Sequence, residues 1–186
     1  EFSNSERGKL VVKIAESCKK IAGREGEILD YYLEALQLYR LDNQDESLEF
    51  ASLLLSVGKQ YALKNDRENA IKCLTKCLAI RMVKLSKDDA AIGQVLAEIG
   101  EVQEFAGNYE EAVKSYSDSL AILRLTPNAE SSKSLIGRLL LRLGELHSKN
   151  RNYDDSMISL VQALEILKEA HGEGNIDVGK AFYALG

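Results

Sequence analysis

The stretch LAEIGEVQEFAGNYEEAVKSYSDSL, from Leu96 to Leu120, decides the fold of this chain. Its apolar residues recur three to four positions apart on both sides of Gly107-Asn108-Tyr109, so they form one stripe on each of two helices. Gly100 lies inside the first helix, where a glycine costs ~1 kcal/mol relative to alanine. This glycine and the small residue Ala112 on the second helix predict a helical hairpin whose two backbones approach closely.

The composition is typical of a helical protein without membrane spans. Hydrophobic residues make up 45% and charged residues 28% of the 186 residues, with one proline and no tryptophan. No run approaches the ~18 consecutive apolar residues of a transmembrane helix, and the N-terminus has no apolar targeting core. The net charge of −5 argues against nucleic acid or an anionic membrane as the main partner.

The three cysteines indicate a reducing compartment, which favours a cytoplasmic location. Cys73 and Cys77 are four positions apart on a predicted helix, so a metal site or a disulfide must be considered. That helix contains no histidine, and we therefore expect both cysteines to be small buried hydrophobic residues. We expect no metal ion and no cofactor.

Three turn motifs with one pattern recur along the chain: Asn65 to Ala70, Gly107 to Ala112 and Arg151 to Ser156. Twelve residues before the end of each motif stands a glycine. These glycines are Gly58, Gly100 and Gly144, and Gly186 continues the series with spacings of 42, 44 and 42. A step of 42 back from Gly58 reaches Glu16, in a helix whose partner, Ile28 to Tyr39, has the same pattern. The sequence therefore predicts four helical hairpins and the first helix of a fifth.

These positions resemble the signature of the tetratricopeptide repeat, which combines apolar, glycine and aromatic positions on one helix with small and aromatic positions on the next. In the third hairpin the matching residues are Leu96, Ile99, Gly100, Gln103, Ala112, Tyr116 and Ser119. In the first hairpin they are Val12, Ala15, Glu16, Lys19, Ile28, Tyr32 and Ala35. The spacing exceeds the usual ~34 residues and is similar to the long repeats of kinesin light chain and nephrocystin-like proteins.

The resemblance implies an all-α fold, a right-handed α-solenoid of antiparallel helical hairpins that forms a single array over residues 1–186. The expected repeats cover about 9–45, 46–88, 89–130 and 131–174, with a partial fifth helix over 176–186. Thr126-Pro127 is expected to open the first helix of the fourth repeat. Glu1-Phe2 resembles a cloning remnant, and Phe182 and Leu185 are expected to face a missing helix. We therefore expect the sequence to be a fragment of a longer protein.

In tetratricopeptide arrays the inner faces of the first helices line a concave groove that holds a peptide segment of a partner. The resemblance implies such a groove here, with the lining residues Lys13, Ser56, Lys59, Glu98, Glu101, Arg138, Arg142 and Glu145. Arg138 and Arg142 are four positions apart on one face, where two guanidinium groups could grip a carboxylate. Alternatively, these arginines pair with Glu98, Glu101 and Glu145 and merely solvate the groove.

Some tetratricopeptide co-chaperones hold the C-terminal carboxylate of heat-shock proteins with a clamp of Lys, Asn, Asn, Lys and Arg. In repeats one to three the matching residues are Lys13, Ser17, Ser56, Gln94 and Glu98. In repeats two to four they are Leu55, Lys59, Glu98, Arg138 and Arg142. Neither set contains the two asparagines, and both place the carboxylate of Glu98 where it repels the ligand. We therefore expect no clamp of this kind.

The sequence contains no nucleophile elbow, phosphate loop or zinc-binding spacing, so an enzyme is not expected. The carboxylates of Glu98, Glu101 and Glu104 share one helix face, but no histidine or cysteine joins them as a metal cluster. The predicted function is a non-enzymatic scaffold that binds a peptide segment of another protein. The alternative is a structural spacer, or a module that self-associates through its C-terminal end, within a larger protein.

Overall fold

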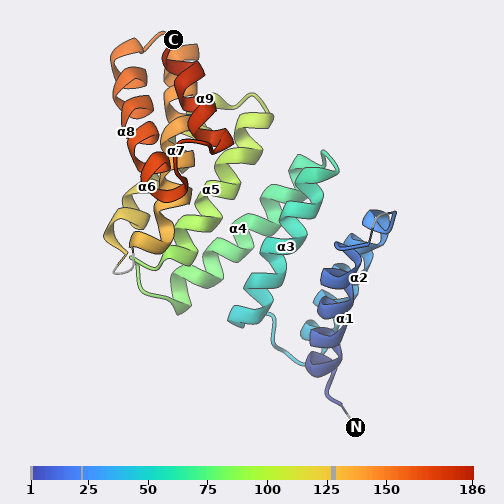
Figure 1. Ribbon diagram of the computed structural model, residues 1–186. Coiled ribbons are helices and arrows are strands. Elements are labelled where there is room, and N and C mark those ends of the chain that lie inside the picture. Colours follow the sequence, from blue (N-terminus) through green and yellow to red (C-terminus); the bar gives the residue numbers. More distant parts are fainter. Residues whose placement is uncertain (1, 22, 127–128) are drawn as a thin grey trace. The chain divides into compact units, whose positions relative to one another are not determined.

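The computed structural model describes residues 2–21, 23–126 and 129–186, and in these residues the chain forms nine α-helices and no strand (Figure 1). Backbone contacts divide the helices into two compact units, Glu1–Leu85 (unit 1) and Ser86–Gly186 (unit 2). Within each unit, consecutive helices pack as antiparallel hairpins. The prediction of an all-α fold built from helical hairpins is therefore confirmed.

Unit 1 contains two hairpins. Their helices are α1 (Asn4–Cys18), α2 (Glu25–Leu41), α3 (Leu48–Leu63) and α4 (Arg67–Lys84). Unit 2 contains two further hairpins and a last helix that packs against both α7 and α8. Its helices are α5 (Ala90–Phe105), α6 (Tyr109–Leu125), α7 (Ala129–Lys149), α8 (Tyr153–His171) and α9 (Ile176–Leu185).

One residue with a left-handed backbone makes the turn inside three of the hairpins. The φ angle is 61° at Asn65, 83° at Gly107 and 61° at Arg151, the first residue of each repeated turn motif. The polar residue that follows each of them precedes the next helix directly. The repeated motifs therefore correspond to one turn geometry, in which glycine and asparagine are the residues of lowest strain.

The first helix begins earlier than the sequence pattern predicted. We expected it near Lys9, whereas α1 begins at Asn4 because Ser3 and Glu6 form a capping box. The Ser3 hydroxyl accepts a hydrogen bond from the Glu6 amide at 3.1 Å, and the Glu6 carboxylate accepts one from the Ser3 amide at 2.8 Å. This cap extends the helix beyond its apolar stripe.

Thr126 ends α6 and contacts the start of its own unit. Its hydroxyl donates to the carbonyl oxygens of Ile122 and Asp88, at 3.1 Å and 3.0 Å. Pro127, expected to open the next helix, lies outside the described residues. Asp89 caps α5, because its carboxylate accepts a hydrogen bond from the Ala91 amide at 2.8 Å.

The glycine series marks places where two paired helices touch. A Cβ atom at Gly100 would lie 2.6 Å from the ring of Tyr116, and one at Gly144 would lie 2.6 Å from Leu160. Across the second of these contacts, the Ser156 hydroxyl donates to the Gly144 carbonyl oxygen at 2.8 Å. The predicted close approach of the two helices of each hairpin is therefore present, and a large side chain fills the space beside each glycine.

A second glycine series, which the repeat alignment missed, lies seven residues before the first. A Cβ at Gly93 would lie 2.8 Å from Leu123, and one at Gly137 would lie 2.7 Å from Leu167. In α1 the corresponding residue is Gly8, whose Cβ would lie 3.1 Å from the Tyr39 ring. In each hairpin with glycines of both series, the two helices therefore approach closely at two positions along their length.

The second series corrects the predicted alignment of the first repeat by one residue. Ala15, seven residues after Gly8, is fully buried, and Tyr32 of the partner helix is buried with it. Glu16, which we placed at that packing position, is exposed and accepts a hydrogen bond from the Tyr32 hydroxyl. The one-residue shift arises because the packing positions Ala15 and Tyr32 are 17 positions apart, whereas Gly100 and Tyr116 are 16 positions apart.

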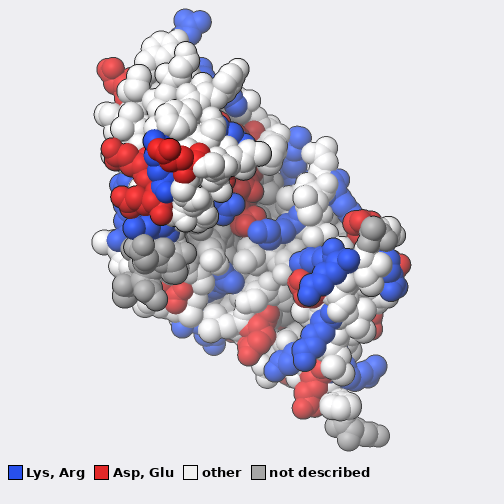
Figure 2. Space-filling model, viewed as in Figure 1, with Lys and Arg blue, Asp and Glu red and all other residues white. Residues whose placement is uncertain are grey.

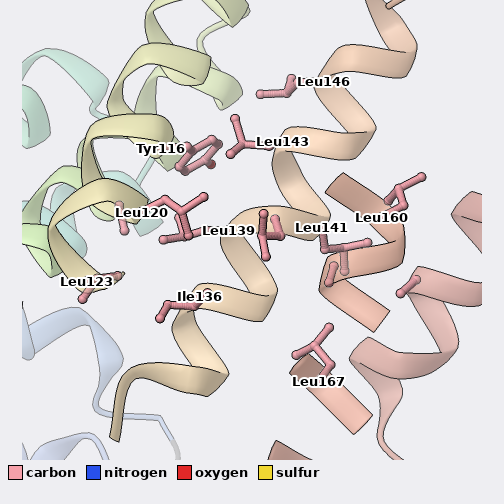
Figure 3. Packing of buried hydrophobic residues seen from close by; sticks show 14 of the residues in the cluster. Tyr116, Leu120, Leu123, Ile136, Leu139, Leu141, Leu143, Leu146, Leu160 and Leu167 are labelled. Carbon is pink, nitrogen blue, oxygen red and sulfur yellow. The ribbon is translucent and has the colours of Figure 1, made fainter. Parts of the chain in front are cut away.

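Large apolar side chains from α6, α7 and α8 form the core of unit 2 (Figure 3). Tyr116 points from α6 toward Leu143 on α7, and the last helix adds Val178 and Ala181. Leu185 packs partly buried against this core, so the expectation that it faces a missing helix was wrong.

Candidate protein-interaction site

Unit 2 contains a hollow of about 410 Å³ between the inner faces of α5, α7 and α9. Its lining residues are Ala97, Glu101, Tyr116, Leu135, Arg138, Leu139, Leu141, Arg142, Glu145, Asp177 and Lys180. The floor is apolar, since Ala97 and Leu141 are about nineteen-twentieths buried. Charged groups of both signs stand around this floor, and Figure 2 shows acidic and basic side chains close together on the visible face of unit 2.

The structure brings four of the predicted groove residues to this hollow: Glu101, Arg138, Arg142 and Glu145. All four arise from the helical pattern, because positions four apart on α5 and on α7 project from the same face. Tyr116 and Asp177 were missing from the predicted residues. Tyr116 comes from the second helix of a hairpin, and the position of α9 against α7 depends on tertiary packing.

Arg142 is held by two carboxylates. Its Nη1 atom lies 3.7 Å from Oε1 of Glu104 and 3.5 Å from Oε2 of Glu145. Partial burial lowers the pKa of Arg142, but the negative charges of Glu104 and Glu145 outweigh this and hold the pKa above its usual value. Arg142 is therefore charged and ion-paired, and its side chain lines the hollow.

Tyr116 orients the Glu104 carboxylate through a hydrogen bond. Its hydroxyl donates to Oε2 of Glu104 at 2.9 Å, and its ring is fully buried beside Gly100. Burial, together with the negative charge of Glu104, raises the pKa of Tyr116 well above its ordinary value. The tyrosine therefore stays neutral and donates a hydrogen bond to the carboxylate.

Arg138 differs from Arg142, although the two are one helical turn apart on α7. Its side chain is exposed, and within the described residues it forms no hydrogen bond or ion pair. Lys180, the third cation of the hollow, pairs with Asp177 at 2.9 Å. Arg142 is thus paired within the hollow, whereas Arg138 has no partner among the described residues.

Unit 1 has its own hollow between α1 and α3. Lys13 and Ser56 from the predicted set lie there, together with Lys9, Val12, Tyr39, Leu48, Glu49, Ser52 and Leu53. Figure 2 shows basic side chains along the visible face of α1. The presence of Lys9 and Val12 agrees with the one-residue shift in the alignment of the first repeat.

The remaining predicted residues lie outside both hollows. Lys59 is exposed on α3, and Glu98 is half-buried on α5. With the corrected alignment, the clamp positions in the first helix are held by Val12 and Glu16 instead of Lys13 and Ser17. An apolar residue and a carboxylate there make a carboxylate clamp still less suitable.

The cysteines are packed in unit 1. Cys77 is fully buried, and burial raises the pKa of its thiol to about 11. Cys73 is half-buried, and neither of these residues forms a disulfide. Across the described ranges, no group of three or more His, Cys, Asp or Glu side chains could hold a metal ion. None of the helices in those ranges has the length and apolar character needed to cross a membrane.

Comparison with known proteins agrees with the repeat pattern. Residues 49–124 match the family model described as tetratricopeptide repeat. This segment includes α3 to α6 almost completely. It therefore contains the second and third hairpins, which carry Gly58 and Gly100. No match was found among curated proteins.

Solved structures with the same fold cover nearly the whole chain. BtubC (BKLC) from P. vanneervenii has 14% sequence identity and a TM-score of 0.85, with 92% of this chain and 67% of that chain covered. A Podosopora anserina protein assigned as a kinesin light chain, with nearly identical TPR-like repeats, has 14% identity and a TM-score of 0.76, covering 98% and 84%. A variant of that protein has a TM-score of 0.78 at 14% identity, covering 100% and 85%. Residues 49–124 are therefore similar to the tetratricopeptide repeat, and the chain shares the fold of these kinesin light chain-like repeat structures.

Proposed function

We propose that this chain is a non-enzymatic protein-interaction module that binds a peptide segment of a partner in the hollow between α5, α7 and α9. Tetratricopeptide repeats generally mediate contacts between proteins. The observation that supports a binding role for this hollow is the side chain of Arg138. It is an exposed guanidinium without a partner in the described residues, beside an apolar floor.

The apolar floor and the cation suit different parts of one segment. Leu135, which lines the hollow and is partly exposed, offers a surface on which an apolar side chain can bury area, which contributes ~25 cal/mol per Å². The guanidinium of Arg138 can form two parallel hydrogen bonds with a carboxylate of the same segment. An extended or helical peptide carries both groups within the span of the hollow.

The test compares two charge reversals. Arg138→Glu should abolish capture of partners by the immobilised chain, whereas Lys114→Glu should leave it unchanged. Lys114 is exposed on α6 and lies outside the hollow, so both variants change the net charge equally. Partners captured from a cell extract are quantified by mass spectrometry, and circular dichroism verifies that both variants are helical. Equal capture by the two variants would contradict the proposal.

A second candidate function is self-association through the C-terminal end. Phe182 and Tyr183 on α9 are 50% and 89% exposed, and large apolar surfaces of this kind favour contacts between proteins. Sedimentation at increasing protein concentration tests it. A monomer at all concentrations would exclude this function, and a Phe182→Ser variant that stays monomeric while the wild type dimerises would support it.

We also propose a cytoplasmic location. Three cysteines without a disulfide are compatible with a reducing compartment. Imaging of the tagged protein in cells tests the location, and retention in a secretory compartment would contradict it.

A further inference from the structure

The carboxylate of Glu104 lies behind the hollow rather than in it. It does not line the hollow, and its side chain is only 11% exposed. On one side it accepts a hydrogen bond from the Tyr116 hydroxyl, and on the other it faces Nη1 of Arg142. Glu104 therefore connects a fully buried residue of α6 to a charged residue that faces the ligand space.

Within unit 2 this connection occurs in the third hairpin; in the first hairpin, Tyr32 at the same repeat position donates to Glu16, which pairs with Lys19 instead of an arginine. The residues that correspond to Tyr116 in the neighbouring hairpins are Leu74 and Leu160, which also fill the space beside a glycine but have no hydroxyl group. The hydroxyl of Tyr116 thus adds a polar anchor to a packing position that is apolar in the second and fourth hairpins. Such an anchor orients the Glu104 carboxylate, because a nearly buried carboxylate keeps the hydrogen bonds that compensate its desolvation.

The charges around the hollow depend on this anchor. Arg142 is compensated by Glu104 and Glu145, and Lys180 by Asp177. Arg138 is left as the exposed cation that no described residue compensates. Without Glu104, the guanidinium of Arg142 would lose one of its two ion pairs and keep the one with Glu145, three residues away on its own helix.

We propose that Glu104 is a positioning residue that sets the ligand charge accepted by this hollow. By holding Arg142, it leaves Arg138 as the one guanidinium available to a bound segment, so the hollow accepts one carboxylate at this position rather than two. The inference rests on the proposed binding function for its ligand, but the pairing of Arg142 can be measured without any ligand. Glu104→Gln is the informative variant, because the amide oxygen still accepts the Tyr116 hydroxyl proton while the negative charge is removed.

The first experiment measures the reactivity of the two arginines in the full chain. Phenylglyoxal modifies accessible guanidinium groups, and mass spectrometry of peptides gives a separate rate for each site. In the wild type we expect Arg138 to react several times faster than Arg142. Glu104→Gln should lower the ratio of the Arg138 rate to the Arg142 rate by at least about twofold, because Arg142 loses a pairing charge. Glu104→Asp, which restores the charge, should return the ratio toward that of the wild type.

The matched control for the charge change is Glu110→Gln. Glu110 is exposed at the start of α6 and lies outside the hollow, so its neutralisation should leave both rates unchanged. Equal rates for Arg138 and Arg142 in the wild type would overturn the proposal. So would an unchanged ratio in a Glu104→Gln variant whose circular dichroism spectrum is that of the wild type.

The second experiment measures binding with defined probes. Two fluorescein-labelled peptides of equal length in a glycine-serine background carry one glutamate or two adjacent glutamates. Fluorescence anisotropy should give the wild type a less than twofold preference between them. Glu104→Gln should favour the two-glutamate peptide by about threefold or more, with a steeper salt dependence.

The two experiments separate the two claims. If neither peptide binds any variant, the proposed function of the hollow fails, and the reactivity ratio alone decides the role of Glu104. If the peptides bind but Glu104→Gln has the wild-type preference, the charge-setting role fails while the binding function stands. A purely structural role of Glu104 would change the melting temperature without altering either the reactivity ratio or the preference.

Discussion

Gly100 shows how a single missing Cβ shapes a hairpin. A methyl group there would lie 2.6 Å from two ring carbons of Tyr116, which is fully buried and therefore has little room to move. We expect Gly100→Ala to lower the free energy of unfolding by about 1–3 kcal/mol, as overpacking does in other cores. Denaturant unfolding followed by circular dichroism measures the change.

Gly179→Ala is the matched control for this substitution. Gly179 lies inside α9, and a Cβ there would meet no atom within 4 Å. Because alanine favours the helix over glycine by ~1 kcal/mol, this variant should be as stable as the wild type or more stable. If both substitutions had the same effect, the contact with Tyr116 would not explain the glycine at position 100.

Arg151 carries backbone strain that its counterparts reduce or avoid. It adopts a φ of 61° in the turn between α7 and α8, where the third hairpin has Gly107. Arg151→Gly should raise the free energy of unfolding by about 0.5–1 kcal/mol, since glycine reaches the left-handed region without a clash. Lys149→Gly, inside the last turn of α7, should instead destabilise the protein. A loss of stability in both variants would show that the turn conformation is not the cause.

Asp66 gives the second hairpin a pH-dependent cap. Its carboxylate accepts the side-chain and backbone N–H groups of Asn69 at 2.8 Å and 3.2 Å, and these hydrogen bonds hold its pKa below the ordinary value. A lowered folded pKa contributes stability above the unfolded value near ~4, which is lost as pH falls through the folded pKa. Thermal unfolding between about pH 5 and pH 2 should therefore show a smaller pH dependence in Asp66→Asn. An identical dependence in both proteins would contradict the assignment to this residue.

At the scale of helices, α7 and α8 pack closely because leucine side chains of α8 occupy the space beside glycines of α7. Leu167 is fully buried, and its Cγ would lie 2.7 Å from a Cβ added at Gly137. Leu167→Ala should cost about 2–5 kcal/mol through the cavity that it leaves, and Gly137→Ala about 1–3 kcal/mol through overpacking. In the double variant the new methyl group occupies part of the cavity. The double variant should lose less stability than the sum of the losses in the two single variants, by at least about 0.5 kcal/mol in a double-mutant cycle. Exact additivity would show that the residues do not share this space.

The helical hairpins could be predicted from the sequence because the spacing of the apolar residues and the recurring turn motifs indicated the same helix boundaries. The alignment of the first repeat could not be derived from one glycine series, since Ala15 replaces the glycine there. Gly8, Gly93 and Gly137 carry the missing information, because they lie seven residues before the close-approach positions. A search for two small residues seven apart on the first helix of each hairpin would have placed Ala15 correctly.

The candidate site was predictable only where it depends on one helix face. Arg138 and Arg142 were placed together by their spacing on α7, yet the sequence could not tell which of them is paired. That difference arises from Glu104, on another helix, and from Tyr116, which orients it. Tertiary distances of this kind depend on how three helices pack, and a helical periodicity contains no information about them.

At the scale of the whole molecule, the division into two units makes a prediction about folding. The core of unit 2 is built from side chains of α5 to α9, including Tyr116, Leu123 and Leu146. Since hairpin arrays gain stability from neighbouring contacts, residues 86–186 expressed alone should remain helical and unfold cooperatively. Circular dichroism during thermal unfolding measures this, and Leu146→Ala should lower the midpoint strongly because that side chain is fully buried. The same fragment contains every residue of the hollow, so its Arg138 should also react faster than its Arg142. A fragment without a cooperative transition would show that the unit 2 core cannot fold without residues 1–85.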